Sequence, residues 1–182
     1  MIFLRKVKRI LEFDPNYFMD DCKYVIWPEA VKTFRIPDAI ILEHSQKLSV
    51  LDILTHQRME EETIEKLIHN KNPLGLWFYI SRHQTLSEDF IRRHANEVDW
   101  EQICQNQVLS EPFMKEFSRN LDWDNACKYQ QMSDPFIRRH APKIVWDTAC
   151  RYQYISPETL DDFYDAVDWK VASWCQELNE EL

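Results

Sequence analysis

The sequence predicts an all-α fold, an α-solenoid of about seven short helix-turn-helix repeats of 23 residues. Two observations lead to this prediction. The segment Leu86–His94 (LSEDFIRRH) is nearly repeated at Met132–His140 (MSDPFIRRH), two periods of 23 residues later. Tryptophans follow the same period, at Trp77, Trp100, Trp123, Trp146 and Trp169. A repeat of about 20–50 residues indicates supersecondary units that stack on one another.

In chain order, the pattern begins with a half unit over residues 1–12, which we expect to form a capping helix. A helical repeat array then covers residues 13–177, in seven units: 13–35, 36–58, 59–85, 86–108, 109–131, 132–154 and 155–177. The unit 59–85 is four residues longer than the others, with the extra residues near Asn72–Gly75. An acidic tail over residues 178–182 follows the array.

Each unit is expected to hold two short helices, as the unit 86–108 illustrates. Ser87 and Asp99 are residue types that cap a helix N-terminus with a side-chain oxygen. Leu86 and Ile91 flank the first of these caps as a hydrophobic staple. Prolines suit the first helical turn, and they recur there: Pro112, Pro135 and Pro157. Because helices this short are marginal alone, each unit must pack against its neighbours.

Two sets of recurring positions are interpreted as structural. The periodic tryptophans are core residues, since large aromatic side chains supply buried area. Glutamine recurs on the apolar stripe of the second helix: Gln57, Gln84, Gln107, Gln130, Gln153 and Gln176. A buried amide needs hydrogen-bond partners. We favour a ladder in which each amide bonds the backbone of the next inter-helix turn, and recognition of nucleobases is the alternative.

Cysteines, histidines and acidic runs are also interpreted as structural. Three cysteines recur at the period, too far apart for disulfides in stacked helices, and are expected to be small buried side chains: Cys104, Cys127 and Cys150. Three histidines share a position that is Leu or Phe in other units: His44, His94 and His140. The runs Glu60–Glu62 and Asp161–Asp162 are interpreted as solvated faces. No catalytic residue, metal site or cofactor is predicted.

Composition excludes several classes of enzyme and a membrane span. Gly75 is the only glycine, whereas phosphate loops, dinucleotide-binding turns and nucleophile elbows each need at least two. The net charge of −9 argues against tight, non-specific binding of nucleic acid. No apolar run approaches the ~20 residues of a membrane helix. Five cysteines without a C-x-x-C pair predict free thiols in a reducing compartment, and hence a cytoplasmic protein.

One group of positions suggests a ligand surface. The second helices carry basic residues next to rings: Arg82, Lys128 and Arg151 beside His83, Tyr129 and Tyr152. The first helices add four arginines: Arg92, Arg93, Arg138 and Arg139. Basic residues beside stackable rings are typical of proteins that bind single-stranded nucleic acid. The alternative, which the acidic net charge favours, is a solvated face with salt bridges inside the array.

Residues 86–107, with the pattern LSEDFI…VDW…Q, resemble a short tandem helical repeat of about 23 residues found in hypothetical bacteriophage and large DNA virus proteins. The resemblance covers residues 80–177 well and the earlier units loosely, with departures at Pro28, Val50 and residues 70–75. It implies a phage or viral origin and, with it, the host-cell cytoplasm. It implies no activity, because no catalytic motif belongs to the family.

The leading functional hypothesis is therefore a non-enzymatic binding protein. Stacked repeats present an extended surface whose exposed positions vary without disturbing the core. The expected partner is a protein, such as a host enzyme or defence component that is inhibited by occupation of its surface, and an acidic DNA mimic is one version of this. The alternatives are an array that binds single-stranded nucleic acid and a cryptic enzyme whose cleft is built from distant side chains.

Overall fold

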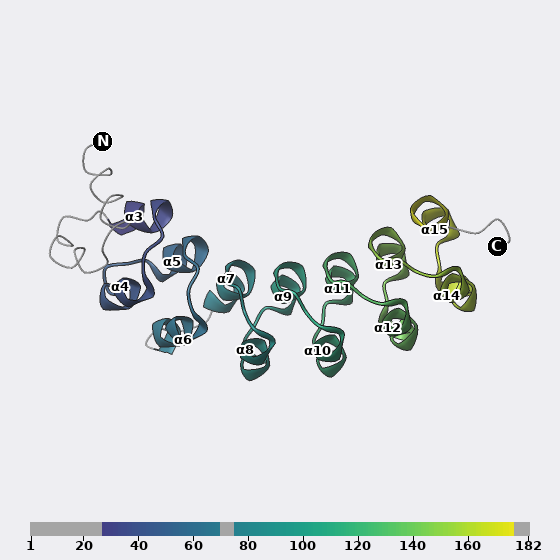
Figure 1. Cartoon of the computed structure of the whole chain (residues 1–182), viewed down its shortest axis with the longest axis horizontal. Helices are drawn as coiled ribbons and strands as arrows, with labels where there is room; N and C mark the ends of the chain where they lie inside the picture. Colours follow the sequence, from purple (N-terminus) through teal and green to yellow (C-terminus); the bar gives the residue numbers. More distant parts are fainter. Residues whose placement is uncertain (1–26, 70–74, 177–182) are drawn as a thin grey trace. The chain divides into compact units, whose positions relative to one another are not determined.

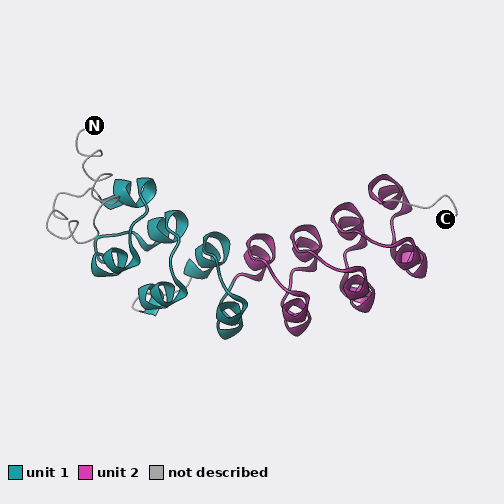
Figure 2. Cartoon of the chain, in the orientation of Figure 1, with its two compact units in different colours: residues 1–98 teal, residues 99–182 magenta. Residues whose placement is uncertain are grey.

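A computed structural model describes residues 27–69 and 75–176. The predicted capping helix over 1–12, the first half of the unit 13–35 and the tail 178–182 lie outside the described residues. The described residues are all-α, as the sequence predicts, with no strand among them. They form two compact units, residues 1–98 and residues 99–182 (Figure 2). The division falls inside the predicted repeat 86–108.

In the first compact unit, three second helices of the repeats pack one after another: α3 (Trp27–Thr33), α5 (Val50–His56) and α7 (Leu76–His83). Three first helices alternate with them along the chain: α4 (Asp38–Glu43), α6 (Glu61–His69) and α8 (Glu88–Arg93). The two sets form separate layers (Figure 1). Apolar side chains from both layers fill the core between them, including Ile41, Ile53, Leu54, Ile64 and Ile91.

The second compact unit repeats this arrangement with greater regularity. Its second helices are α9 (Trp100–Asn106), α11 (Trp123–Tyr129), α13 (Trp146–Tyr152) and α15 (Trp169–Cys175), and each packs on the next. Its first helices are α10 (Glu111–Glu116), α12 (Asp134–Arg139) and α14 (Pro157–Asp162). Short 3₁₀ turns, Ala141–Lys143 and Tyr164–Ala166, follow α12 and α14. Figure 1 shows α10, α12 and α14 in one layer and the second helices in the other.

Side-chain caps define where most of these helices begin. Ser87 accepts a hydrogen bond from the backbone N–H of Phe90, and Asp99 from that of Gln102, as predicted. The same type of cap recurs at Ser49, Ser110, Asp122, Ser133, Ser156 and Asp168. Val145 stands at the cap of α13, where it supplies no side-chain hydrogen bond. Three prolines lie in first turns, also as predicted: Pro112, Pro135 and Pro157.

Five tryptophans couple one repeat to the next. Trp100 lies 5.2 Å, between ring centroids, from Phe117 of the following repeat, and Trp146 lies 5.0 Å from Phe163. Histidine takes the place of this phenylalanine in three pairs: Trp27–His44, Trp77–His94 and Trp123–His140. The sequence predicts packed, hydrogen-bonded histidines, and this is confirmed for His94 and His140, whose ring nitrogens have polar partners. His44 is packed in the same way, but its Nε2 is buried without a hydrogen-bond partner among the described residues. Ring pairs of this kind add about 0.5–1.5 kcal/mol beyond the area that they bury.

Gly75 lies at the N-terminus of α7 with a φ of 86°, a left-handed conformation that side chains rarely adopt. A Cβ atom at this position would meet nothing within 4 Å, so backbone conformation rather than space favours glycine. None of the helices in residues 27–69 and 75–176 is long and apolar enough to cross a membrane.

Candidate binding surfaces

The recurring glutamines form a ladder of hydrogen bonds that occupies their side-chain amides. Gln130 donates from Nε2 to the carbonyl oxygens of Cys104 (2.7 Å) and Gln107 (2.8 Å), and its Oε1 accepts from the backbone N–H of Leu109 (2.9 Å). The same three contacts recur at Gln57, Gln84, Gln153 and Gln176. Because both ends of these amides are occupied, they have no group left with which to read a nucleobase.

The direction of this ladder differs from the prediction. The sequence analysis places each amide on the next inter-helix turn, but Gln130 reaches back to the end of α9 in the preceding repeat. Gln107 and Gln130 are the C-cap residues of the second helices α9 and α11. The last carbonyl groups of a helix lack hydrogen-bond partners within that helix. The amide therefore satisfies the C-terminus of the preceding helix, a role that the spacing of the glutamines does not reveal.

A second ladder, not predicted, runs along the first helices. The carboxylate of Glu111 accepts from the backbone N–H of Ser133 in the next repeat (2.6 Å). The equivalent pairs are Asp38 with Glu60, Glu61 with Ser87, and Asp134 with Ser156. The interpretation of Glu60–Glu62 as a solvated run is therefore wrong for Glu61. The sequence feature that could have revealed this second ladder is an acidic residue at the first position of each first helix: Asp38, Glu61, Glu88, Glu111 and Asp134.

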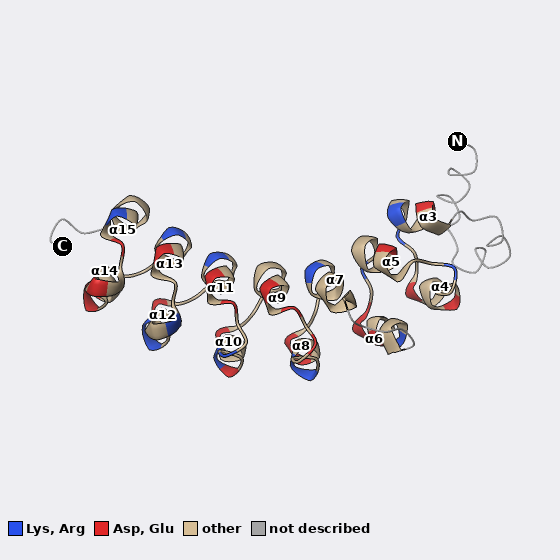
Figure 3. Cartoon of the chain, turned by 180° about the vertical axis from the view of Figure 1, so that it is seen from behind, with Lys and Arg blue, Asp and Glu red and all other residues tan. Residues whose placement is uncertain are grey.

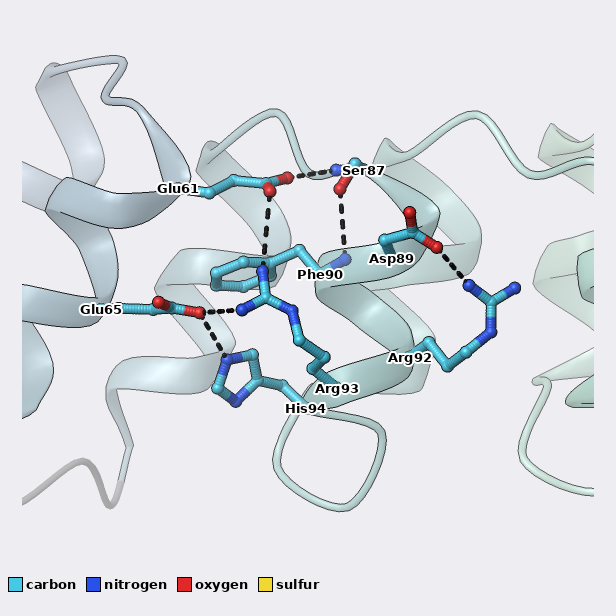
Figure 4. A network of polar contacts seen from close by, with 8 residues as sticks. All are labelled: Glu61, Glu65, Ser87, Asp89, Phe90, Arg92, Arg93 and His94. Atoms are coloured by element: carbon cyan, nitrogen blue, oxygen red, sulfur yellow. Dashed lines mark hydrogen bonds and ion pairs between the residues drawn. The ribbon is translucent and has the colours of Figure 1, made fainter.

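The predicted arginines of the first helices are mostly engaged in ion pairs. Figure 4 shows Arg93 between Glu65 and Glu61, at 2.6 and 4.0 Å, with His94 also facing Glu65. Arg92 pairs with Asp89 on its own helix. The contacts of Arg93 and His94 join α6 to α8 inside the first compact unit. They match the predicted alternative, a solvated face with internal salt bridges.

The second compact unit pairs its arginines in the same way. Arg138 contacts Asp162 and the hydroxyl of Thr159, both in the next repeat. Asp162 is therefore not simply part of a solvated run, as the sequence analysis expects. Arg139 is exposed and has no ion pair within the part of the chain that the structure describes. Charges of both signs occur on α11, α12 and α13 (Figure 3).

The structure brings together three of the predicted stripe residues. The Lys128 ammonium lies 5.0 Å from the ring centroid of Tyr129 and 5.6 Å from that of Tyr152, in the next repeat. A hydrogen bond to Tyr129 and charge interactions with both phenols raise the pKa of Lys128. Arg151 is bound to Asp147, one turn earlier on α13, and this ion pair raises its pKa. Of these two basic residues, Lys128 is therefore the one that contacts both exposed rings.

Arg82 and His83 belong to the other compact unit. The Arg82 guanidinium lies 5.7 Å from the ring centroid of Phe78. The His83 ring stacks on Tyr79, 6.3 Å away. Burial, together with the neighbouring Arg82, Arg58 and His56, lowers the pKa of His83, so that its imidazole is neutral at pH 7.

Exposed apolar and aromatic side chains occur at the ends of the second helices and in the linkers of the second compact unit. Tyr129 and Tyr152 are 49% and 53% exposed, although they end helices that are otherwise packed. Two residues in the linkers after the glutamines are even more exposed, Val108 at 94% and Tyr154 at 69%. We call the set of Val108, Lys128, Tyr129, Tyr152 and Tyr154 the tyrosine surface. Sequence analysis missed the linker residues Val108 and Tyr154, because they do not recur as one residue type.

A hollow opens beside this surface. Its volume is about 580 Å³, and it is lined by two consecutive linkers, residues 107–111 and residues 129–133. Tyr129 and Val108 both contribute to its walls. The linker backbone is extended, with φ and ψ of −105° and 158° at Gln107 and of −95° and 152° at Gln130. Tyr129 is the aromatic residue among those that line the hollow.

The three buried thiols have low reactivity as nucleophiles and as metal ligands. Cys104, Cys127 and Cys150 are fully buried, as predicted. Burial raises the pKa of Cys104 to about 12 and that of Cys127 and Cys150 to about 11. The thiolate is the nucleophile and the metal ligand, so these thiols are inert near neutral pH. Across residues 27–69 and 75–176, no three His, Cys, Asp or Glu side chains converge in a way that could hold a metal ion.

Comparison with protein-family models, with curated proteins and with solved structures finds no match to this chain. The resemblance to a repeat family of phage and viral proteins stays a prediction.

Proposed function

We propose that this chain is a non-enzymatic helical-repeat protein that binds a partner protein through the tyrosine surface. The supporting observation is the contrast between side chains that are used internally and those that are not. The glutamines and most of the arginines bind other parts of the array. Tyr129, Tyr152, Tyr154 and Val108, by contrast, expose large apolar surfaces to solvent. Tyrosine is enriched in protein interfaces because it combines a large apolar body with a polar end.

The resemblance to phage and viral repeats extends this proposal to the setting. In an infected cell the partner would be a host protein in the cytoplasm, and binding would inhibit it by covering its surface. The acidic net charge of −9 is compatible with an inhibitor that mimics DNA. A DNA mimic would be a rival to binding through the tyrosine surface: acid-to-amide changes along one face would then abolish inhibition, whereas changes to the tyrosine surface would not.

A capture experiment tests the proposal. The tagged full-length chain is used to isolate partners from cell extract, with and without nuclease, beside the variant Tyr129→Ala/Tyr152→Ala. We expect a stoichiometric protein that survives nuclease and is lost from the variant. Tyr164→Ala is the matched control, because Tyr164 is also exposed but lies on the 3₁₀ turn after α14. A partner that the control loses and the double variant keeps would overturn the proposal.

Single-stranded nucleic acid is the second candidate. It is favoured by one observation, the position of Lys128 between the rings of Tyr129 and Tyr152. Rings stack on bases and cations contact phosphates in such sites. This candidate predicts RNA or single-stranded DNA binding that weakens steeply with salt and disappears in Lys128→Ala/Arg151→Ala. The absence of binding at low salt would eliminate it.

A further inference from the structure

Four basic side chains lie where α5 and α7 end. His56 is the last residue of α5, and Arg82 and His83 are the last two residues of α7. Arg58 follows in the linker that leaves α5. The two helices pack directly against each other in the first compact unit. We call Arg58, Arg82, His56 and His83 the basic cluster.

Hydrogen bonds of the glutamine ladder hold the linker of Arg58 against the end of α7. Gln84, the residue after His83, donates from Nε2 to the carbonyl oxygen of Gln57 (2.8 Å). Its Oε1 accepts from the backbone N–H of Met59 (3.2 Å). Arg58 is the residue between these two contacts. Because the contacts use backbone groups of the linker, they do not depend on the side chain of Arg58.

The two guanidinium groups of the basic cluster form no ion pair within residues 27–69 and 75–176. The Arg82 guanidinium lies 5.7 Å from the ring centroid of Phe78. Burial, together with the positive charges of Arg82, Arg58 and His56, lowers the pKa of His83. The charged groups that act on this imidazole are therefore all basic.

Carboxylates on the neighbouring helices do not compensate this charge. α7 itself has no acidic residue. On α5, Asp52 lies 3.8 Å from Lys32 of α3. The carboxylates drawn in Figure 4 pair with arginines of α8. Glu60 lies in the same linker as Arg58, but it is not among the charged groups that shift the pKa of His83.

The ligand that such a cluster favours is a compact anion. A guanidinium group matches the geometry of phosphate with two parallel hydrogen bonds. The net charge of −9 does not oppose a single phosphate, because exposed charges more than ~8 Å away are largely screened at physiological ionic strength. A dianion gains more than a monoanion, since it faces two guanidinium groups and also stabilises a proton on a neighbouring imidazole.

We propose that the basic cluster at the ends of α5 and α7 is a binding site for a doubly charged phosphate group, carried by free phosphate or by a small phosphate monoester. Arg58 and Arg82 hold the phosphate oxygens, and His83 takes up a proton when the anion binds. The site lies in the first compact unit and the tyrosine surface in the second, so this inference does not depend on the proposed function.

A titration of the full-length chain with inorganic phosphate tests the proposal. Proton NMR follows the imidazole signals at constant ionic strength, and His83→Gln identifies the signal of His83. We expect a saturable shift of this signal. We also expect a higher pKa of His83 with phosphate bound, because a nearby anion favours the imidazolium.

The variant Arg58→Gln/Arg82→Gln removes both guanidinium groups and leaves the backbone contacts of the linker in place. It should weaken phosphate binding by about tenfold or more, the loss expected when charge-assisted hydrogen bonds are removed. Without phosphate, the pKa of His83 should rise in this variant, because two repelling charges are gone. Arg139→Gln is the matched control, since Arg139 is exposed and lies in the other compact unit.

Two further probes distinguish the sources of the phosphate group. Saturable binding of phosphoserine as well as inorganic phosphate would support a monoester as the ligand, and binding of inorganic phosphate alone would support the free ion. An oligothymidine without terminal phosphates carries one charge per phosphate and should bind more weakly than either. If it binds more tightly, the ligand is a nucleic-acid backbone and the proposal is wrong.

Two other results would overturn the proposal. One is the absence of a saturable shift of the His83 signal with inorganic phosphate. The other is equal phosphate binding by the parent chain and by Arg58→Gln/Arg82→Gln. Circular dichroism of each variant shows whether the helical fold is retained.

Discussion

At the scale of single residues, a buried amide holds three backbone segments together. Gln130 satisfies two carbonyl oxygens at the end of α9 and one N–H at the start of the following linker. A carboxamide suits this role because it carries two donors and an acceptor on one planar group. Neither a glutamate, which has no donor, nor a leucine, which has no polar atom, could make all three contacts.

We therefore predict that Gln130→Ala lowers the free energy of unfolding by about 2–4 kcal/mol, because it leaves three buried backbone groups without partners. Gln131→Ala is the matched control, since Gln131 is the next residue and is exposed. Urea denaturation followed by circular dichroism measures both variants. Equal effects of the two substitutions would show that the ladder contributes little to stability.

Thiol reactivity also follows from the surroundings of single residues. Cys104, Cys127 and Cys150 are buried, and Cys175 is exposed. The fifth cysteine, Cys22, lies outside the described residues and is replaced by serine for this experiment. In the Cys22→Ser chain, iodoacetamide at pH 8 should modify Cys175 rapidly and the three buried thiols only on unfolding. Mass spectrometry of timed samples identifies the modified residues. Rapid modification of Cys127 under native conditions would contradict the packing described for α11.

At the scale of helices, the caps set where each element starts. A serine begins four of the first helices, α8, α10, α12 and α14, and an aspartate begins three of the second helices, α9, α11 and α15. Val145 breaks the second series. Since no side chain accepts a hydrogen bond at that helix N-terminus, α13 lacks a stabilising contact that the equivalent helices have.

Val145→Asp should therefore stabilise the protein by about 1 kcal/mol, because the new carboxylate can accept from the first turn of α13. Val145 is partly exposed, so the carboxylate gains this contact without being buried. Val145→Ala is the control, because it removes the isopropyl group and adds no acceptor. A thermal melt compares the two variants with the parent chain. If Val145→Asp is no more stable than Val145→Ala, the missing cap does not limit the stability of α13.

At the scale of the whole molecule, the three buried thiols together make stability depend on alkaline pH. Burial raises their pKa values from 9.0 to about 11 or 12. Folded thiols therefore keep their protons at a pH where unfolded thiols lose them. We expect full stability below pH 9 and a progressive loss as the pH rises from 9 towards 12. The urea midpoint measured over this range should fall less steeply in Cys104→Ala, and an unchanged slope would contradict the assignment.

The sequence predicts the architecture well because a repeat presents each structural demand several times. The period of Trp77 to Trp169 and the caps at Ser87 and Asp99 identify the helices without any knowledge of contacts. Contacts between repeats are harder to predict, since they depend on how one helix lies on the next. The backward reach of Gln130, the bond from Ser133 to Glu111 and the place of Lys128 between two rings are all of this kind.

The glutamine ladder has a consequence for how the chain folds. Its bonds join residues that are only 21 to 30 positions apart along the chain. Local contacts of this type give a low contact order, and proteins of low contact order fold fast. Folding can begin at any one repeat and spread to its neighbour. Duplicating a repeat would add one more link of the same kind, so an array of this sort can lengthen in evolution without inventing a new contact.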